Sequence, residues 1–392
     1  MKTRFLLAAG LLAVTAFAGP EAWRVSLNAR LRYEGVEQTG LRDAEALTLR
    51  TRLGLAPAPW HGWMALFEVE NLAPLDGDAY NQAGLNPGGA GRAVVADPEG
   101  TGINQAWVAF KAGSSTLTAG RQRLVFDNAR FIGDSGWRQN MQTFDAIALQ
   151  DQSLEKTTLS YAWLGRVNRV FGDRHPQGYW RSNSHLFNAT YGGFAAGTLT
   201  GYAYLLDFRG GGAAQGCATY GASFAGATPL TRAFKLTYRA ELATQSDHGH
   251  SALDYRADYR ALELGLAAKT GAFALGREVL GTGGGVGFKT PLATLHAFNG
   301  WADLFLATPA AGLRDTYVKA SATLPTGASG TVFYHWFASD GAAADPGREF
   351  DAQVARKFGK RFTGLVKYAS FRREAPAFPE VRKIWMQVEF SY

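Results

Sequence analysis

The sequence predicts an all-β protein, a transmembrane antiparallel up-and-down β-barrel in an outer membrane. Three observations predict this fold. The N-terminus has the pattern of an export signal, many short segments alternate apolar and polar residues, and the connectors between these segments alternate between long and short. We expect 18 strands, with 16 as the alternative, because the pattern is irregular in places.

The N-terminal segment begins with Lys2 and Arg4 and continues with an apolar stretch over residues 5–17, which ends in the pattern Ala16-Phe17-Ala18 before Gly19. This order is typical of a secretory signal, and the apolar stretch is too short for a membrane helix. A buried helix, the alternative, would need caps and a polar face that the segment lacks. We therefore expect residues 1–18 to be a signal peptide and residues 19–392 to form a single barrel domain.

The composition narrows the classes of function. Cys217 is the only cysteine, so the sequence predicts a free thiol near a Gly-rich loop and no intramolecular disulfide. No apolar run after the signal is long enough for a membrane helix, so a membrane role must come from strands. The net charge of +7 favours acidic solutes or anionic lipid. No nucleic-acid partner is expected, because the sequence has no basic-helix, zinc or RNA-binding motif.

Residues 23–34 show the clearest alternation. The apolar set is Trp23, Val25, Leu27, Ala29, Leu31 and Tyr33, and the polar set is Arg24, Ser26, Asn28, Arg30, Arg32 and Glu34. A period of two places these sets on opposite faces of a strand. In a soluble sandwich the apolar set would face a core, whereas in an outer-membrane barrel it faces lipid and the polar set faces a wet lumen. One strand leaves both interpretations open.

The connector lengths separate these interpretations. Most of the alternating segments have the roughly 9 to 11 residues that a tilted strand needs to cross a bilayer. The long connectors lie near residues 72–102, 126–141, 166–183 and 281–313. Short turns such as residues 112–114 and 358–360 alternate with them. Long external loops and short periplasmic turns are the outer-membrane pattern, so we expect these four connectors to be external loops.

The last segment, residues 382–392, ends on Tyr392 and has Ile384, Met386 and Val388 on one face. A final strand that ends on an aromatic residue resembles the signal by which barrels are recognised for assembly. We therefore expect two partners, the barrel-assembly machinery and outer-membrane lipid, and a location in the bacterial outer membrane.

One segment has an irregular register. The apolar residues Tyr255, Ala257 and Tyr259 occupy odd-numbered positions. Further along the segment the apolar residues Leu262 and Leu264 occupy even-numbered positions, so the apolar side chains change face. A β-bulge near Arg260 would explain the change, as would two shorter strands.

Basic residues dominate the face that would line the lumen. If the apolar parity faces lipid, the inward cations include Arg30, Arg32, Arg50, Arg52, Arg239, Arg256, Arg260 and Lys319. Acidic residues on the same face would neutralise some of them, which is the polar lining that any wide barrel needs. The second interpretation is a row of weak anion sites, because guanidinium groups bind carboxylates bidentately and a basic pore concentrates anions.

The richest stretch runs over residues 120–146, where Arg and Asp are interleaved with aromatic residues. Its cations include Arg121, Arg123, Arg130 and Arg138. This composition favours a constriction folded into the lumen over an ordered external loop.

In this stretch the sequence resembles the alginate export family of outer-membrane porins. The resemblance also rests on Leu31-Arg32-Tyr33-Glu34, on Glu68-Val69-Glu70-Asn71 and on residues 278–303. It implies a monomeric 18-stranded barrel with an electropositive lumen, through which an anionic uronate polysaccharide leaves the periplasm. It assigns that role to Arg121, Arg123, Arg130 and Arg138, and more loosely to the other inward cations.

Two channel functions stay open at this point. One is an exporter of an alginate-type polysaccharide, and the other is an uptake porin for small organic anions. A barrel enzyme is not expected, because no nucleophile is matched with a histidine. The His248-Gly249-His250 spacing is weak for a metal, so neither a metal nor a cofactor is expected.

Overall fold

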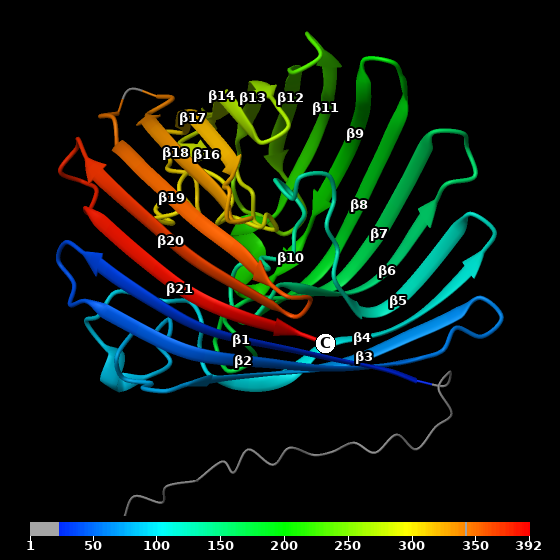
Figure 1. Ribbon diagram of the computed structural model, residues 1–392, viewed down its shortest axis with the longest axis horizontal. Helices are drawn as coiled ribbons and strands as arrows, with labels where there is room; N and C mark the ends of the chain where they lie inside the picture. The colour runs from blue at the N-terminus through cyan, green and yellow to red at the C-terminus, as the bar shows by residue number, and fades with distance from the viewer. Residues whose placement is uncertain (1–22, 342) are drawn as a thin grey trace, which may run out of the picture.

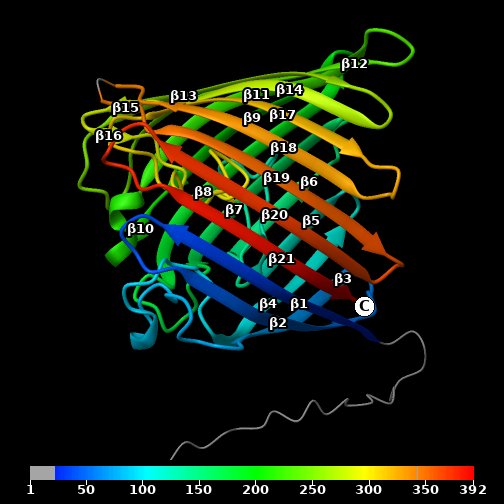
Figure 2. The same ribbon diagram turned by 60° about the vertical axis from the view of Figure 1, so that its left-hand side comes forward.

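Eighteen long antiparallel strands form one sheet that closes into a barrel (Figures 1 and 2). The computed structural model describes residues 23–341 and 343–392, so the predicted signal peptide lies outside the described residues. In this part of the chain, no helix has the length and apolar character needed to cross a membrane. The predicted all-β barrel with 18 strands is confirmed.

The long strands follow one another around the ring in chain order. They are β1 (Trp23–Gln38), β2 (Ala44–Pro57), β3 (Trp63–Pro74), β4 (Gly100–Ala112), β5 (Ser115–Gln122), β6 (Thr143–Asp151), β7 (Thr157–Asn168), β8 (Tyr179–Phe194), β9 (Gly197–Leu206), β11 (Cys217–Pro229), β12 (Lys235–Asp247), β13 (Arg256–Ala267), β14 (Gly271–Leu280), β17 (Leu313–Thr323), β18 (Ser329–Ala338), β19 (Gly347–Phe358), β20 (Phe362–Arg373) and β21 (Val381–Ser391). The short elements are β10 (Phe208–Arg209) beside β8, the hairpin of β15 (Thr282–Gly283) and β16 (Val286–Gly287), and the 3-10 helices η1 (Pro87–Gly89) and η2 (Gly210–Gln215).

The first and last strands close the ring. β1 pairs antiparallel with β21, in a register that runs from Asn28 opposite Ser391 to Gln38 opposite Val381. Closure satisfies the hydrogen-bonding groups that the edges of an open sheet would expose to lipid. Cys217, the free cysteine, is buried at the start of β11, directly after η2.

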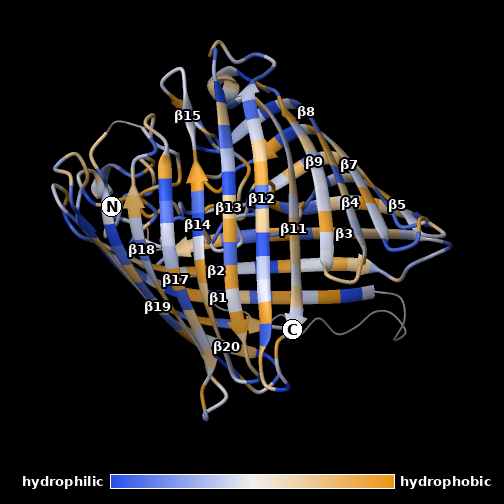
Figure 3. Ribbon diagram, turned by 90° about the horizontal axis from the view of Figure 1, so that it is seen from above, coloured by the Kyte–Doolittle hydropathy of each residue, from blue (hydrophilic) through white to orange (hydrophobic). Residues whose placement is uncertain are grey.

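The outer face of the barrel carries exposed apolar side chains at every second position of the strands. On β13, Leu262, Leu264 and Leu266 are exposed, whereas Gly265 between them is buried. Figure 3 shows hydrophilic and hydrophobic residues alternating along β12 and β13. This is the period of two expected for a wall with lipid on one side and a polar interior on the other.

The predicted register of this strand near Arg260 is wrong. β13 pairs with β12 and β14 without a register shift, so the strand has no bulge. Arg256 and Arg260 are exposed on the same face as Leu262, whereas Tyr259 on the other face is buried. Arg256 and Arg260 therefore lie on the outer face and do not line the lumen.

Arg256 and Arg260 can lie on the outer face because the surroundings of that face change along β13. Towards the extracellular end of β13 the outer face leaves the apolar band, so polar side chains suit it. At the same height the interior is packed with aromatic rings, because Tyr259 contacts Phe131 and Phe288 at ring-centroid distances of 5.2 and 5.5 Å. Apolar residues therefore face inward at this end of the strand and outward in the lipid band.

The connectors have different lengths at the two ends of the barrel. At the periplasmic end they are turns such as residues 113–114 and 195–196, and at the other end they include residues 75–99 and 169–178. Two of the long connectors fold into the barrel. For residues 126–141 this agrees with the constriction that the composition of residues 120–146 favours, whereas residues 281–313 were expected to be an external loop. We call residues 123–142 the first inner loop and residues 281–312 the second inner loop. Figure 1 shows them as teal and yellow segments surrounded by the strands.

Candidate functional site in the barrel lumen

Arginines on the barrel wall hold the backbone of the first inner loop. Nη1 of Arg30 donates to the carbonyl oxygens of residues 136–138 at 3.2 to 3.4 Å. Nη2 of Arg32 donates to the carbonyl of Trp137 at 2.5 Å, and its guanidinium lies 4.2 Å from the centre of the Trp137 ring. Arg52 donates to the carbonyl of Gln139 at 3.2 Å. Three arginines that were predicted to bind anions therefore donate hydrogen bonds to the backbone of the loop.

The strand register explains why so many cations meet here. Arg30 lies directly opposite Arg50 in the pairing of β1 with β2. Like charges at this spacing repel each other, so they need acceptors close by. Glu389 supplies one, 3.0 Å from Nε of Arg30 and 3.6 Å from Nη2 of Arg50, and Glu70 forms an ion pair with Arg52. Among the described residues, Nε and Nη1 of the buried Arg50 have no hydrogen-bond partner.

Arg138 connects the first inner loop to the second. Its Nη2 lies 2.6 Å from Oδ2 of Asp303, and its Nη1 lies 3.2 Å from Oε2 of Glu34 on β1. Asp303 also accepts from Nζ of Lys383 at 2.9 Å. Burial opposes ionisation of Asp303, but the attraction of Lys383 and Arg138 and the hydrogen bond from His296 outweigh it and hold the pKa of this carboxyl well below its ordinary value. The contact therefore joins two charged groups.

Aromatic rings surround this connection. The Trp137 ring stacks on His296 with a centroid distance of 4.4 Å and an interplanar angle of 3°. Nδ1 of His296 lies 2.7 Å from Oδ1 of Asp303, and its Nε2 lies 2.7 Å from Nζ of Lys367 on β20. Burial and the nearby charges of Lys367 and Arg138 hold the pKa of His296 well below its ordinary value. The imidazole is therefore neutral at neutral pH.

Arg130 makes a second connection between the inner loops. Its guanidinium binds the carboxylate of Glu278 on β14, with nitrogen to oxygen distances of 2.6 and 3.2 Å. It also donates to Oδ1 of Asn299 in the second inner loop at 3.0 Å, and it lies 4.7 Å from the centre of the Phe298 ring. Tyr259 donates to Glu278 at 2.6 Å. Nε and Nη2 of Arg130 are therefore bound within the fold.

The second inner loop is anchored on β19 through its backbone. The amide of Trp301 donates to Asp351 at 3.1 Å, and the amide of Ala302 donates to Glu349 at 2.6 Å. Gly300 has a φ of 83°, and a Cβ at this position would lie 2.5 Å from a carboxylate oxygen of Glu349. Only glycine fits this approach without strain.

Three predicted lumen cations keep part of their surface free. The side chain of Arg123 is 50% exposed and pairs with Asp134 at 2.5 Å. Arg239 on β12 pairs with Asp127 of the first inner loop at 2.5 Å. Lys319 on β17 lies 5.3 Å from the centre of the Phe333 ring, and no carboxylate of the described residues lies within 4.0 Å of it. These side chains are the ones that a solute in the lumen would meet.

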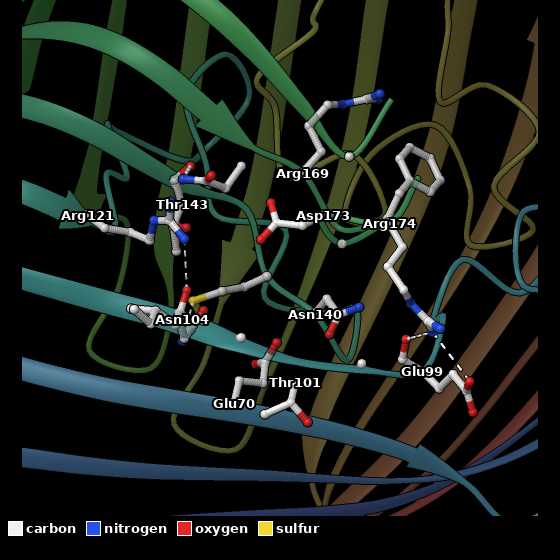
Figure 4. A pocket seen from close by; sticks show the side chains of 18 residues that line it. Glu70, Glu99, Thr101, Asn104, Arg121, Asn140, Thr143, Arg169, Asp173 and Arg174 are labelled. Carbon is white, nitrogen blue, oxygen red and sulfur yellow. Dashed lines mark hydrogen bonds and ion pairs between the residues drawn. The ribbon is translucent and has the colours of Figure 1, made fainter. Parts of the chain in front are cut away.

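Arg121 borders a cleft in the barrel wall. β4 pairs with β5 only from Ala106 onward, so residues 100–105 have no strand neighbour on that side. A cavity of about 160 Å³ lies there, lined by Arg121, Asn140 and Asp173 among others (Figure 4). Arg121 binds Asp145 at 2.7 Å. The cleft is separate from the contacts that join the inner loops.

The sequence interpretation missed a second cavity, of about 540 Å³, at the extracellular end. We call this cavity the vestibule. It lies between residues 169–180, η2 and the second inner loop, and Arg169, Trp180, Gln215 and Lys289 are among its lining residues. Neither cation stood out in the sequence, because each is a single basic residue in a loop. In the described residues, no cluster of three or more His, Cys, Asp or Glu side chains is placed to hold a metal ion.

A family model described as alginate export matches residues 24–205. The predicted resemblance to the alginate export family is confirmed. The match spans β1 to β9 and includes the first inner loop. The predicted likeness over residues 278–303 lies outside it and stays a prediction. No curated protein matches the chain.

Solved outer-membrane porin structures have the same fold. OccAB4 of Acinetobacter baumannii is 13% identical, with 95% of this chain and 98% of that chain covered and a TM-score of 0.74. OpdL of Pseudomonas aeruginosa is 14% identical, with 94% and 98% covered and a TM-score of 0.71. OpdK of Pseudomonas aeruginosa, solved with vanillate, is 14% identical, with 94% and 98% covered and a TM-score of 0.68. The chain therefore has the fold of these outer-membrane porins.

Proposed function

We propose that the protein is a selective channel for small organic anions that carry carboxylate groups, and that the two inner loops are its selectivity filter. The observation that carries this proposal is the joining of the two loops across the lumen. Arg138 and Arg130 each contact both a wall strand and the second inner loop, at distances of 2.6 to 3.3 Å. A polymer would need these buried contacts to break, whereas a small solute would need only the space between them.

The size of the vestibule supports the same solute class. Its volume is about 540 Å³. Cavities that hold one small ligand are typically a few hundred Å³. The partly exposed Arg123, Arg239 and Lys319 would attract anions, and their moderate exposure suits a path of weak sites from which a solute can leave.

Export of a uronate polysaccharide is the second candidate. The match of residues 24–205 to the alginate export family favours it. This function would require both inner loops to leave the lumen, so it predicts that a long oligouronate has a large effect on the current, whereas a single uronate has little.

Ion selectivity in a planar bilayer tests the main proposal. We expect the reversal potential in a salt gradient to indicate anion preference, and monomeric carboxylates such as benzoate and glucuronate to reduce the chloride current at millimolar concentration. Neutral glucose at the same concentration is the matched control. Cation preference, or equal effects of glucuronate and glucose, would contradict the proposal. A block that grows steeply with oligouronate length would favour the exporter.

A further inference from the structure

The vestibule contains two cations from different parts of the chain. Arg169 follows β7, and Lys289 belongs to the second inner loop. Nζ of Lys289 donates to the carbonyl of Ala214 in η2. Arg169 stacks at 4.0 Å on Trp180, and Trp180 packs on Gly212 of the same short helix. Both cations line the cavity of about 540 Å³.

These cations have no acidic partner, in contrast to the arginines deeper in the lumen. Within the described part of the chain, no carboxylate lies within 4.0 Å of Arg169 or Lys289, and the residues that line the vestibule include no Asp or Glu. Nη1 of Arg169 donates a hydrogen bond to the carbonyl of Gln177, at 3.1 Å. Figure 4 shows its side chain extending away from Asp173. Donors of both cations therefore remain for a ligand.

Both cations are half-buried. Burial lowers the pKa of Arg169 to about 10, so Arg169 is charged at neutral pH, and burial also lowers the pKa of Lys289. A charge that is partly removed from water without a counter-ion is costly, so an anion that enters would lower the free energy of this region.

The rest of the lining decides what kind of anion fits. Leu295 and Leu306 supply apolar surface, and Gln177 and Gln215 supply amides that donate and accept hydrogen bonds. A bare inorganic anion would leave the apolar surface uncovered. A carboxylate attached to a body of one or two rings would cover that surface and still reach a cation.

We propose that the vestibule is a binding site for small ring-bearing carboxylates, with Arg169 and Lys289 as the anion-binding residues. This inference rests on the proposed anion channel, because the site would capture the solute before it reaches the inner loops. The residues that line the vestibule do not include Arg123, Arg239 or Lys319, and Arg169 borders both the vestibule and the wall cleft. Binding here raises the solute concentration at the mouth of the filter.

Equilibrium binding to the purified, detergent-solubilised protein tests the site without any measurement of current. Isothermal titration calorimetry with benzoate and with glucuronate should give saturable binding of one ligand per chain. The double variant Arg169→Gln with Lys289→Gln should bind each ligand at least 10-fold more weakly. Arg169→Lys, which keeps the charge but loses the planar donor fork, should have an intermediate effect.

The matched control removes the same charge from the same end of the barrel. Arg174→Gln with Arg372→Gln changes two exposed arginines that lie outside the vestibule lining, and it should bind as the unmodified protein does. The heat-dependent shift in gel mobility, typical of folded barrels, should be the same in all variants. Unchanged binding by the Arg169→Gln, Lys289→Gln variant, or an equal loss in the control variant, would overturn the site.

The two proposals fail in different measurements. If the unmodified protein prefers anions in the bilayer but binds neither ligand, the vestibule site is wrong and the channel proposal stands. If both ligands bind and the binding requires Arg169 and Lys289, whereas the bilayer current shows no anion preference, the vestibule site stands and the proposed filter is wrong.

Discussion

Nη2 of Arg138 lies 2.6 Å from Oδ2 of Asp303, and the two residues are 165 positions apart in the chain. This contact joins the two inner loops in the middle of the lumen. Both side chains are almost fully shielded from water, so removal of either partner would leave a buried charge without this compensation.

Removal of Arg138 should open the filter. In Arg138→Ala, Asp303 and Glu34 would lose their shared cation, and a buried ion pair that loses one partner typically costs about 3 to 5 kcal/mol. The cost falls on the inner loops and leaves the ladder of the barrel wall intact. We expect a larger single-channel conductance and more frequent current fluctuations in planar bilayers. Arg174→Ala, which breaks an exposed pair with Glu99, is the control and should leave the conductance unchanged.

Acidification should weaken the closure of the inner loops through His296. The pKa of His296 is held below 6.5 in the closed arrangement, so an opened loop binds a proton more readily. The closed state is therefore most stable above pH 6.5 and loses at most about 1.4 kcal/mol per pH unit as the pH falls below that value. We expect higher conductance at pH 5 than at pH 7.5. In His296→Gln this rise should be absent, and its persistence would assign the effect to another group.

The exposed lumen cations should set the anion preference. Arg123→Gln with Lys319→Gln should reduce the permeability ratio of anions to cations several-fold, because these side chains are accessible to a solute in the lumen. The matched variant, Arg256→Gln with Arg260→Gln, removes the same charge from the outer face. Reversal potentials measure both. Equal reductions in the two variants would mean that net charge, and no particular path, determines selectivity.

Cysteine labelling checks the outward position of Arg256. In intact cells, Arg256→Cys should react with a membrane-impermeant maleimide, because the residue is exposed at the extracellular end of β13. Leu264→Cys lies in the lipid-facing band of the same face and should be protected. The native Cys217 is buried and provides a silent background. Absence of labelling at position 256 with a folded barrel would contradict the register of β13.

Alanine at position 300 should loosen the second inner loop. Gly300 has a positive φ, and an added Cβ would approach the carboxylate of Glu349. We expect Gly300→Ala to increase the conductance as Arg138→Ala does, without a change in the thermal unfolding of the barrel. Gly327→Ala, at a positive φ in a periplasmic turn with open space around it, separates general backbone strain from the specific clash. If both variants have normal conductance, the anchor on β19 does not control the filter.

The sequence by itself determined the barrel, its 18 strands and the end at which the long connectors lie. Each of these depends on information carried by neighbouring residues: a period of two within a strand such as residues 23–34, and the spacing between strands. It also determined that Arg30, Arg32, Arg50 and Arg52 project inward, because their strands keep one parity throughout.

Only the tertiary structure decided what those inward cations contact. Arg32 binds the backbone of Trp137 and Arg138 binds Asp303, and neither pairing has a local signal, because loop closure brings together residues that are more than 100 positions apart. The tertiary structure also decided which face of β13 is outside. There, aromatic rings pack inside the barrel, so the apolar residues of the strand face inward and not toward lipid. Arg256 and Arg260 therefore point away from the lumen, although their charge suggested that they line it.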